Sequence, residues 1–312
     1  MSNYFDKKDL FLEPKVNQYG SHMVMTNVTK PTKTKYINLD TKFSDDFNYN
    51  RCGNSYYNSI ESYTFTLPER LTEVKEFNVL LPIFKKQGLK ELYRFLMEMS
   101  QEEVDTILAS LVKREMKRKQ NGGLNKSMPG WWAAKVFQEN DEVVNVDRGV
   151  FSIYLFNIVG LQKGEGIFQA AGIPHAYLEG QNVELMANSD NVLRGGLTPK
   201  HIDVPELMKH TLFEPIVPKI MKGESIGSIE KNYHCPVPDF DISKIELNAG
   251  NSYTALSVSP EIFIAIEGGG IVNGSNTNIN IKKGDSFLVL PNENYSITAS
   301  GHCEMYKAFV NL

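Results

Sequence analysis

One short layout occurs twice in the second half of the chain, and it constrains the fold more than any other feature of the sequence. Gly164-Glu165-Gly166 precedes the apolar pair Ile167-Phe168, and Gly172-Ile173-Pro174 follows a few residues later. Further on, Lys283-Gly284-Asp285 precedes an apolar run at 286–290 that a proline closes. A glycine turn, a short apolar strand and a proline in this order are typical of antiparallel jelly-roll structure. The repeat predicts two jelly-roll barrels.

Residues 83–118 have a helical pattern instead. Apolar residues recur at helical spacing before Ser100 and again after it, and Ser100 is followed three residues later by Glu103. This serine and glutamate form a capping-box pattern, which marks the start of a helix. The pattern predicts two helices joined by a short turn, the second of which ends at Asn121-Gly122-Gly123. Further short helices are expected at Trp131-Trp132 and at Pro205–His210.

Charge and hydropathy exclude several classes of partner. The formal net charge is only −4, and the one basic cluster, Lys113–Lys119, lies at the end of a predicted helix, where it complements the helix dipole. We therefore expect no nucleic-acid partner. The sequence contains no run of 18 apolar residues and no apolar stretch at its N-terminus, so we expect no membrane association and a cytoplasmic location. Cys52, Cys235 and Cys303 are widely spaced, which favours free thiols in a reducing compartment.

The composition divides the chain into four expected parts. Residues 1–78 are rich in Asn, Tyr, Thr and Lys, with alternating patterns at 36–39 and 63–67 that predict short strands among loops. Residues 79–150 form the expected helical domain. Residues 151–210 form a central portion that carries the candidate site, and residues 211–312 form a C-terminal barrel.

Polar side chains are concentrated between residues 172 and 200. His175 follows a proline at the start of a predicted strand, where an imidazole suits a transition metal. Arg194 and Lys200 flank the Gly195-Gly196 pair, and two cations on a glycine-rich loop could hold a phosphomonoester. Each residue also has a structural interpretation. The histidine could be a structural residue, the arginine could fix a turn, and the lysine, like Glu179 and Glu184, could be an ordinary surface residue.

The strings in this region resemble a known family. Pro174-His175-Ala176-Tyr177-Leu178 and the run from Asn188 to Lys200 (NSDNVLRGGLTPK) closely resemble the signature of the type I mannose-6-phosphate isomerases. The resemblance extends over about residues 80–312 and includes the strand before His175 and the helical pair at 83–118. It implies a mainly β fold of cupin-like jelly-roll barrels with a small α-helical insertion.

The resemblance also implies a reaction and a set of site residues. The family interconverts mannose 6-phosphate and fructose 6-phosphate through a cis-enediol, with one zinc ion (Zn2+) per chain. By position, His175 would be a metal ligand and Arg194 would be catalytic, beside the sugar. Lys200 would help to hold the substrate, and Tyr177, Glu184 and Asp190 would line its pocket. The expected partner is therefore a small sugar phosphate.

A second interpretation stays open because part of the family's ligand set is not found. The family takes its other metal ligands from an N-terminal Gln-x-His pair and a distant Glu. The nearest imitation here is Gln18 to His22, with a different spacing. The alternative is a catalytically inactive, cupin-fold protein that binds a sugar phosphate or has a structural role. The runs at 33–41 and 63–70 resemble the N-terminal part of structural proteins from large DNA viruses, and a barrel face left uncovered would favour self-association.

Overall fold

The structure is a computed structural model that describes residues 22–26, 71–137, 142–187, 192–214, 216 and 218–311, with residues 22–26 described by their backbone alone. The strands expected at 36–39 and 63–67 lie outside the described residues, as do Cys52 and Asp190.

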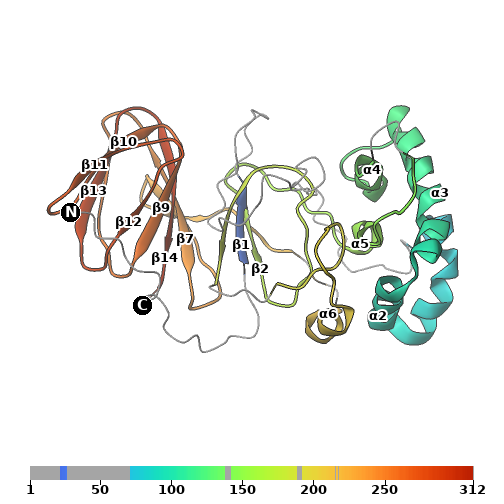
Figure 1. The fold of residues 1–312 in the computed structure, drawn as a ribbon. Helices are drawn as coiled ribbons and strands as arrows, with labels where there is room; N and C mark the ends of the chain where they lie inside the picture. The colour runs from blue at the N-terminus through green and yellow to red at the C-terminus, as the bar shows by residue number, and fades with distance from the viewer. Residues whose placement is uncertain are drawn as a thin grey trace.

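The molecule has a helical region at one end, a central sheet and a C-terminal pair of sheets (Figure 1). Most of the helices lie between β1 (His22–Thr26) and β2 (Gly166–Gln169) in the chain, and α6 lies between β3 (Asn182–Met186) and β4 (Ile220–Met221). They are η1 (Lys75–Val79), α2 (Leu81–Glu98), α3 (Gln101–Gln120), α4 (Pro129–Lys135), α5 (Gly149–Leu155) and α6 (Val204–His210). These bounds confirm the two helices expected at 83–118 and the two short helices. Gly88, with a φ of 79°, interrupts α2 and divides it into two helical pieces.

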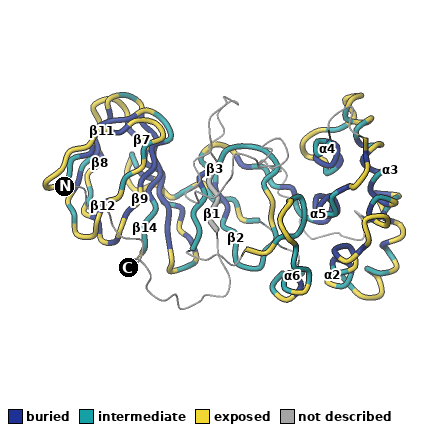
Figure 2. Tube along the Cα trace, viewed as in Figure 1, coloured by how far each residue is buried: buried dark blue, intermediate teal, exposed yellow. Residues whose placement is uncertain are grey.

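The helical region has its own apolar core. Apolar residues of α2 and α3, including Leu92, Leu96 and Leu108, are fully buried there. Helix α5 is buried along its whole length, as Figure 2 shows, and its Phe151 packs against Phe77 with ring centroids 5.8 Å apart. A helix with apolar residues on every side is stable only inside a protein. Helix α5 therefore forms the centre of the helical region.

The start of α3 allows a direct test of the capping box. Ser100 Oγ accepts a hydrogen bond from the Glu103 amide at 3.3 Å, and the Glu103 carboxylate accepts one from the Ser100 amide at 2.8 Å. Replacing Ser100 with alanine should lower the free energy of unfolding by about 1 kcal/mol, because the amide loses its acceptor. Urea denaturation would measure the change. Thr106→Ala, at an exposed position within the same helix, should cost nothing, and an equal loss in both variants would contradict the assignment.

The central sheet has the strand order β3-β1-β2-β4, with antiparallel pairing throughout. Its strands are β1 (His22–Thr26), β2 (Gly166–Gln169), β3 (Asn182–Met186) and β4 (Ile220–Met221). The glycine turn predicted before β2 is present, and Gly164 takes a φ of 83° that favours glycine. The backbone of His22 lies opposite Gln169 on one side and Met186 on the other. Strand β1 is therefore inserted between two strands that follow it far along the chain.

The C-terminal part contains two antiparallel sheets that enclose a second apolar core. One has the order β11-β10-β13-β8 and the other the order β12-β9-β14-β7-β6-β5. The strands are β5 (Glu224–Ile226), β6 (Glu230–Tyr233), β7 (Asp241–Leu247), β8 (Ser252–Leu256), β9 (Glu261–Glu267), β10 (Gly269–Asn273), β11 (Asn278–Lys282), β12 (Ser286–Val289), β13 (Asn294–Ala299) and β14 (Cys303–Phe309). The turn expected at Gly284 precedes β12, and Gly284 has a φ of 92°. The cupin-like architecture with a helical part is confirmed, with open sheets rather than closed barrels.

The outer face of the six-stranded sheet packs against the central sheet. Ile264 and Tyr306 on that face form one apolar cluster with Val183 of β3. Tyr233 donates a hydrogen bond from its hydroxyl to the carbonyl oxygen of Gly164 at 2.6 Å, which joins β6 to the turn before β2. The position of the turn is therefore coupled to the C-terminal sheets. The four domain boundaries given above stay a prediction.

Two further expectations concern the helices and the thiols. None of the helices in the described part of the chain is long and apolar enough to cross a membrane. Cys235 and Cys303 are free and buried, and burial, together with Asp241, raises the pKa of the Cys235 thiol to about 12. The thiol of Cys235 is therefore protonated and unreactive at neutral pH.

Candidate active site

A cavity of about 500 Å³ lies between the helical region and the central sheet. Tyr93 of α2 and Phe156, which follows α5, line the helical side, and Ile167 of β2 lines the sheet side. The segment from Ile173 to Leu178 also contributes to the lining. The cavity therefore includes the two residues His175 and Tyr177 that the sequence places in the site.

His175 is exposed at the edge of this cavity. Its Nδ1 lies 3.1 Å from the carbonyl oxygen of Ile173, and its ring centroid is 6.0 Å from that of Tyr177. A contact of this length favours the tautomer that carries its proton on Nδ1. In that tautomer Nε2 has the lone pair that a metal requires, and a backbone carbonyl on the other nitrogen is a common support for a metal-binding histidine.

Tyr177 and Glu184 form a pair that connects the cavity wall to the sheet. The Tyr177 hydroxyl donates to Glu184 Oε1 at 2.8 Å, and Glu184 lies on β3. Tyr177 lines the cavity, whereas Glu184 does not contribute to its lining. Glu184 therefore supports Tyr177 in this structure.

Arg194 and Lys200 lie on a separate loop. Asp147 Oδ1 holds this loop by accepting hydrogen bonds from the amides of Leu197 at 2.8 Å and Gly149 at 2.7 Å. Leu197 and Gly149 line the cavity, but Arg194 and Lys200 do not. Arg194 is half-buried and Lys200 is exposed. The structure thus brings His175 and Tyr177 to one cavity and leaves the two cations beside it.

Gly196 in this loop is required by close backbone contact with Gly149. A Cβ on Gly196 would lie 2.5 Å from Gly149 Cα, and a Cβ on Gly149 would lie 2.6 Å from the Leu197 nitrogen. Gly196 also has a φ of 122°, where side chains are strained. The two backbones can approach only because residues 149 and 196 are both glycine. Packing therefore requires a glycine at position 196, whether or not the loop binds a phosphate.

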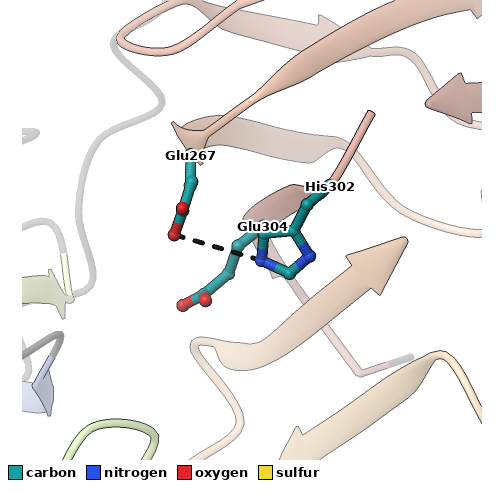
Figure 3. Close-up of side chains that lie close together, drawn as sticks. All are labelled: Glu267, His302 and Glu304. Atoms are coloured by element: carbon teal, nitrogen blue, oxygen red, sulfur yellow. Dashed lines mark ion pairs between the residues drawn. The ribbon is translucent and has the colours of Figure 1, made fainter. Parts of the chain in front are cut away.

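The described residues do not complete a zinc site around His175. Catalytic zinc usually takes three protein ligands. Among the described residues, one group of three side chains has ligand atoms close enough to share a metal: Glu267, His302 and Glu304. This group lies in the C-terminal sheets, and Figure 3 shows Glu267 and His302 facing each other beside Glu304.

The two carboxylates of the group in Figure 3 are already paired with lysine side chains. Lys163 Nζ lies 2.8 Å from Glu304 and 3.7 Å from Glu267, and Lys244 Nζ lies 3.3 Å from Glu304. Two ammonium groups neutralise the carboxylates and would repel a divalent ion. Since Lys163 belongs to the turn before β2, we interpret this group as an ion-pair network that joins the C-terminal sheets to the central sheet.

The structure gives Glu179 partners that the sequence did not indicate. Glu179 accepts hydrogen bonds from Lys126, in the turn between α3 and α4, and from Lys135 of α4, whose Nζ is 2.5 Å away. Partial burial raises the pKa of Glu179, but the two ammonium groups outweigh it, so the pKa lies below its usual value. The sequence signal was weak, because Glu179 is 53 residues from Lys126.

The sequence did not indicate His234, which follows β6 and also lines the cavity. Its Nδ1 lies 3.1 Å from Oδ2 of Asp241, a fully buried carboxylate that also accepts a hydrogen bond from the Cys235 amide at 2.5 Å. The buried carboxylate fixes the orientation of the imidazole at the cavity.

The known proteins whose sequences match this chain include mannose-6-phosphate isomerases. The family model "Mannose-6-phosphate isomerase, cupin domain" matches residues 229–310. The mannose-6-phosphate isomerase of Escherichia coli (strain K12) is 34% identical over 228 residues, which is 72% of this chain and 55% of that protein. The mannose-6-phosphate isomerase of Rattus norvegicus is 35% identical over 190 residues, 58% of this chain and 43% of that protein. The chain therefore spans about half the length of the curated relatives it matches.

Solved structures show the same fold. A crystal structure of a mutant phosphomannose isomerase from Salmonella typhimurium has a TM-score of 0.68 at 24% identity, and covers 94% of this chain and 66% of that one. A mannose 6-phosphate isomerase bound with zinc and yttrium has a TM-score of 0.67 at 24% identity, with 94% and 67% coverage. Over the part that the sequence matches cover, the chain is therefore similar to the mannose-6-phosphate isomerases, and residues 229–310 match the cupin domain of that family.

Proposed function

We propose that the chain is an aldose–ketose isomerase that interconverts mannose 6-phosphate and fructose 6-phosphate. The observation that carries the proposal is the 34% identity over 228 residues to an isomerase of that name. The cavity supports it, because it brings together His175 and Tyr177, two of the residues that the family signature marks. The proposed substrate is a small sugar phosphate.

The proposed roles follow from the charge and position of each residue. The guanidinium of Arg194 would stabilise the negative charge of the enediolate, an interaction that strengthens in the transition state. The exposed ammonium of Lys200 would attract the phosphate group. Tyr177, supported by Glu184, would contact the sugar, and Asp190 is proposed for the same pocket although it lies outside the described residues.

Zinc is the proposed cofactor, one per chain, because a related isomerase has been crystallised with zinc. His175 would supply one nitrogen ligand through Nε2. The described residues do not bring two further ligands to it, so they do not fit a complete zinc site by themselves.

This incomplete ligand set favours a second candidate, a protein that binds sugar phosphates without isomerising them. Such a protein would keep Arg194 and Lys200, and it would not need a tightly held metal. The two candidates differ in metal content and in turnover, and both quantities can be measured on one sample.

The test is elemental analysis of purified, chelator-free protein together with a coupled mannose-6-phosphate isomerase assay. About one zinc per chain with turnover would establish the isomerase and require further ligands beyond His175. Absence of both zinc and turnover would reject it. In that case, binding of mannose 6-phosphate in calorimetry would establish the second candidate.

Replacing Arg194 with alanine tests the catalytic assignment directly. We expect kcat to fall by roughly 10²-fold, with a smaller rise in KM, because the lost interaction is proposed to act mainly in the transition state. The assay is initial-rate kinetics in both directions. Arg94→Ala on α2 is the matched control, since Arg94 pairs with its neighbour Glu91. An unchanged kcat would remove Arg194 from the mechanism.

Self-association and a cytoplasmic location also stay proposals. For self-association, the support is a group of exposed apolar residues on and next to the edge strands β8 and β12, with Leu256 56%, Val258 61%, Leu288 57% and Leu290 61% exposed. Apolar side chains on open sheet edges favour association between chains. Size-exclusion chromatography with light scattering would measure the mass in solution.

A further inference from the structure

We propose that Glu179 is a positioning residue: with Lys126 and Lys135 it clamps the cavity wall that carries His175 and Tyr177 onto the helical region. We call these three residues, together with Trp131, the Glu179 clamp. The proposal rests on the proposed function only where it assigns a task to His175 and Tyr177. The clamp itself is a property of the contacts.

Two lysines from the helical region hold the same carboxylate. Lys126 contacts Glu179 Oε1, and Lys135 Nζ lies 2.5 Å from Glu179 Oε2. Both ammonium groups also lie over the Trp131 ring, each 5.4 Å from its centroid. Trp132 donates from its indole nitrogen to the Lys126 carbonyl at 2.7 Å, which fixes the turn that carries Lys126. Contacts other than the carboxylate therefore also restrict the two lysines.

The clamp is placed where it can position the cavity wall. Residues 173–178 line the cavity, and Glu179 is the next residue along the chain. This segment lacks regular secondary structure apart from a single bridge at Leu178, so few backbone hydrogen bonds fix it. Polar side chains attach it on both sides: Tyr177 bonds to Glu184 on the central sheet, and Glu179 bonds to the helical region, against which Leu178 also packs. Together these contacts hold the wall between the two parts that enclose the cavity.

The exposure of the clamp predicts how it responds to salt. The side chains of Glu179, Lys126 and Lys135 are 39%, 56% and 24% exposed. Ion pairs at this exposure contribute little to global stability and are screened by salt. Opening the clamp should therefore release the local segment without unfolding the protein.

Hydrogen exchange read by mass spectrometry tests the clamp without any need for activity. We expect peptides covering 172–180 to exchange at least about threefold faster in Glu179→Gln than in the wild type at low salt. Glu179→Asp, which keeps the carboxylate, should recover part of the protection. Glu98→Gln, at an exposed position at the end of α2, is the matched control and should behave as the wild type.

The salt dependence separates a clamp from a general structural role. In about 0.5 M NaCl the wild type should approach the exchange of Glu179→Gln, whereas the variant should change little. The two tryptophans of the chain lie together in α4, so their fluorescence should show the same salt dependence. A lowered Tm with faster exchange throughout the protein, or unchanged exchange in 172–180, would overturn the proposal.

The coupled assay then tests positioning. We expect Glu179→Gln to lower kcat about tenfold with KM within about twofold, and Glu179→Asp to restore part of the rate. Turnover unchanged by Glu179→Gln, despite faster exchange, would overturn the positioning role. If the wild type itself has no turnover, the proposed isomerase fails, and the hydrogen-exchange result still decides whether the clamp exists.

Discussion

Replacing Lys307 with methionine should lower the free energy of unfolding by about 3–5 kcal/mol. Lys307 is only 6% exposed and lies inside the C-terminal sheets, where its Nζ is 2.9 Å from Glu230 and 3.9 Å from Glu261. Both carboxylates are themselves buried. Removing the ammonium leaves two buried negative charges without their cation, which costs more than the apolar contacts of methionine can offset.

Hydrogen bonds with two tyrosines also hold Lys307 and its two carboxylates in place. Lys307 donates to the Tyr253 hydroxyl at 2.8 Å, and Tyr253 donates to Glu230 at 3.0 Å. Tyr295 donates to Glu261 at 2.6 Å. Burial lowers the pKa of Lys307, but Tyr253 and Glu230 outweigh burial, so the pKa is raised and the lysine stays charged.

Thermal and urea denaturation of three variants would check this prediction. Lys283→Met, at an exposed position in a turn, is the control and should change stability by less than about 0.5 kcal/mol. Combining Lys307→Met with Glu230→Gln should recover part of the loss, because one uncompensated charge is removed. A loss below about 1 kcal/mol in Lys307→Met would show that the ion pairs are not formed as described.

The second large effect is expected for Gly196→Ala, which should lower the free energy of unfolding by roughly 2–5 kcal/mol. The added Cβ would meet Gly149 Cα at 2.5 Å and Gly149 nitrogen at 2.7 Å, and neither backbone atom can move without shifting α5. The φ of 122° adds strain. The loop that carries Arg194 should therefore separate from Asp147, and any turnover should fall with it.

A matched glycine separates the steric part from the backbone strain. Gly284 has a φ of 92°, and a Cβ there would meet nothing within 4 Å, so Gly284→Ala should cost only about 1–2 kcal/mol of strain. Denaturation curves for both variants give the difference. Equal losses in the two variants would mean that the contact with Gly149 does not limit position 196.

The sequence predicted features that depend on near neighbours. The Ser100–Glu103 capping box, the helices on either side of it and the turns at Gly164 and Gly284 were all visible in the pattern, because each is decided within a few residues. The family signature likewise identified the segments that carry His175 and Arg194.

Features that join distant segments were not predictable. The pairing of Glu179 with Lys126 and of Lys307 with Glu230 depends on how the parts pack, and spacing along the chain contains no information about it. The separation of Arg194 and Lys200 from the cavity lining has the same origin, because the contact between Gly196 and Gly149 sets the path of their loop. The roles of the site residues stay predictions.

The position of β1 between β2 and β3 has a consequence for the order of folding. Strand β1 is synthesised early, but both of its partners emerge from the ribosome only after helices α2 to α5. Contacts of such high sequence separation carry a large loop-closure entropy and form late. Helices α2 to α5 can therefore pack together first, and the central sheet forms only when β1 pairs with β2 and β3. Until then β2 and β3 present open edges, and this interval is when the nascent chain is most exposed to aggregation.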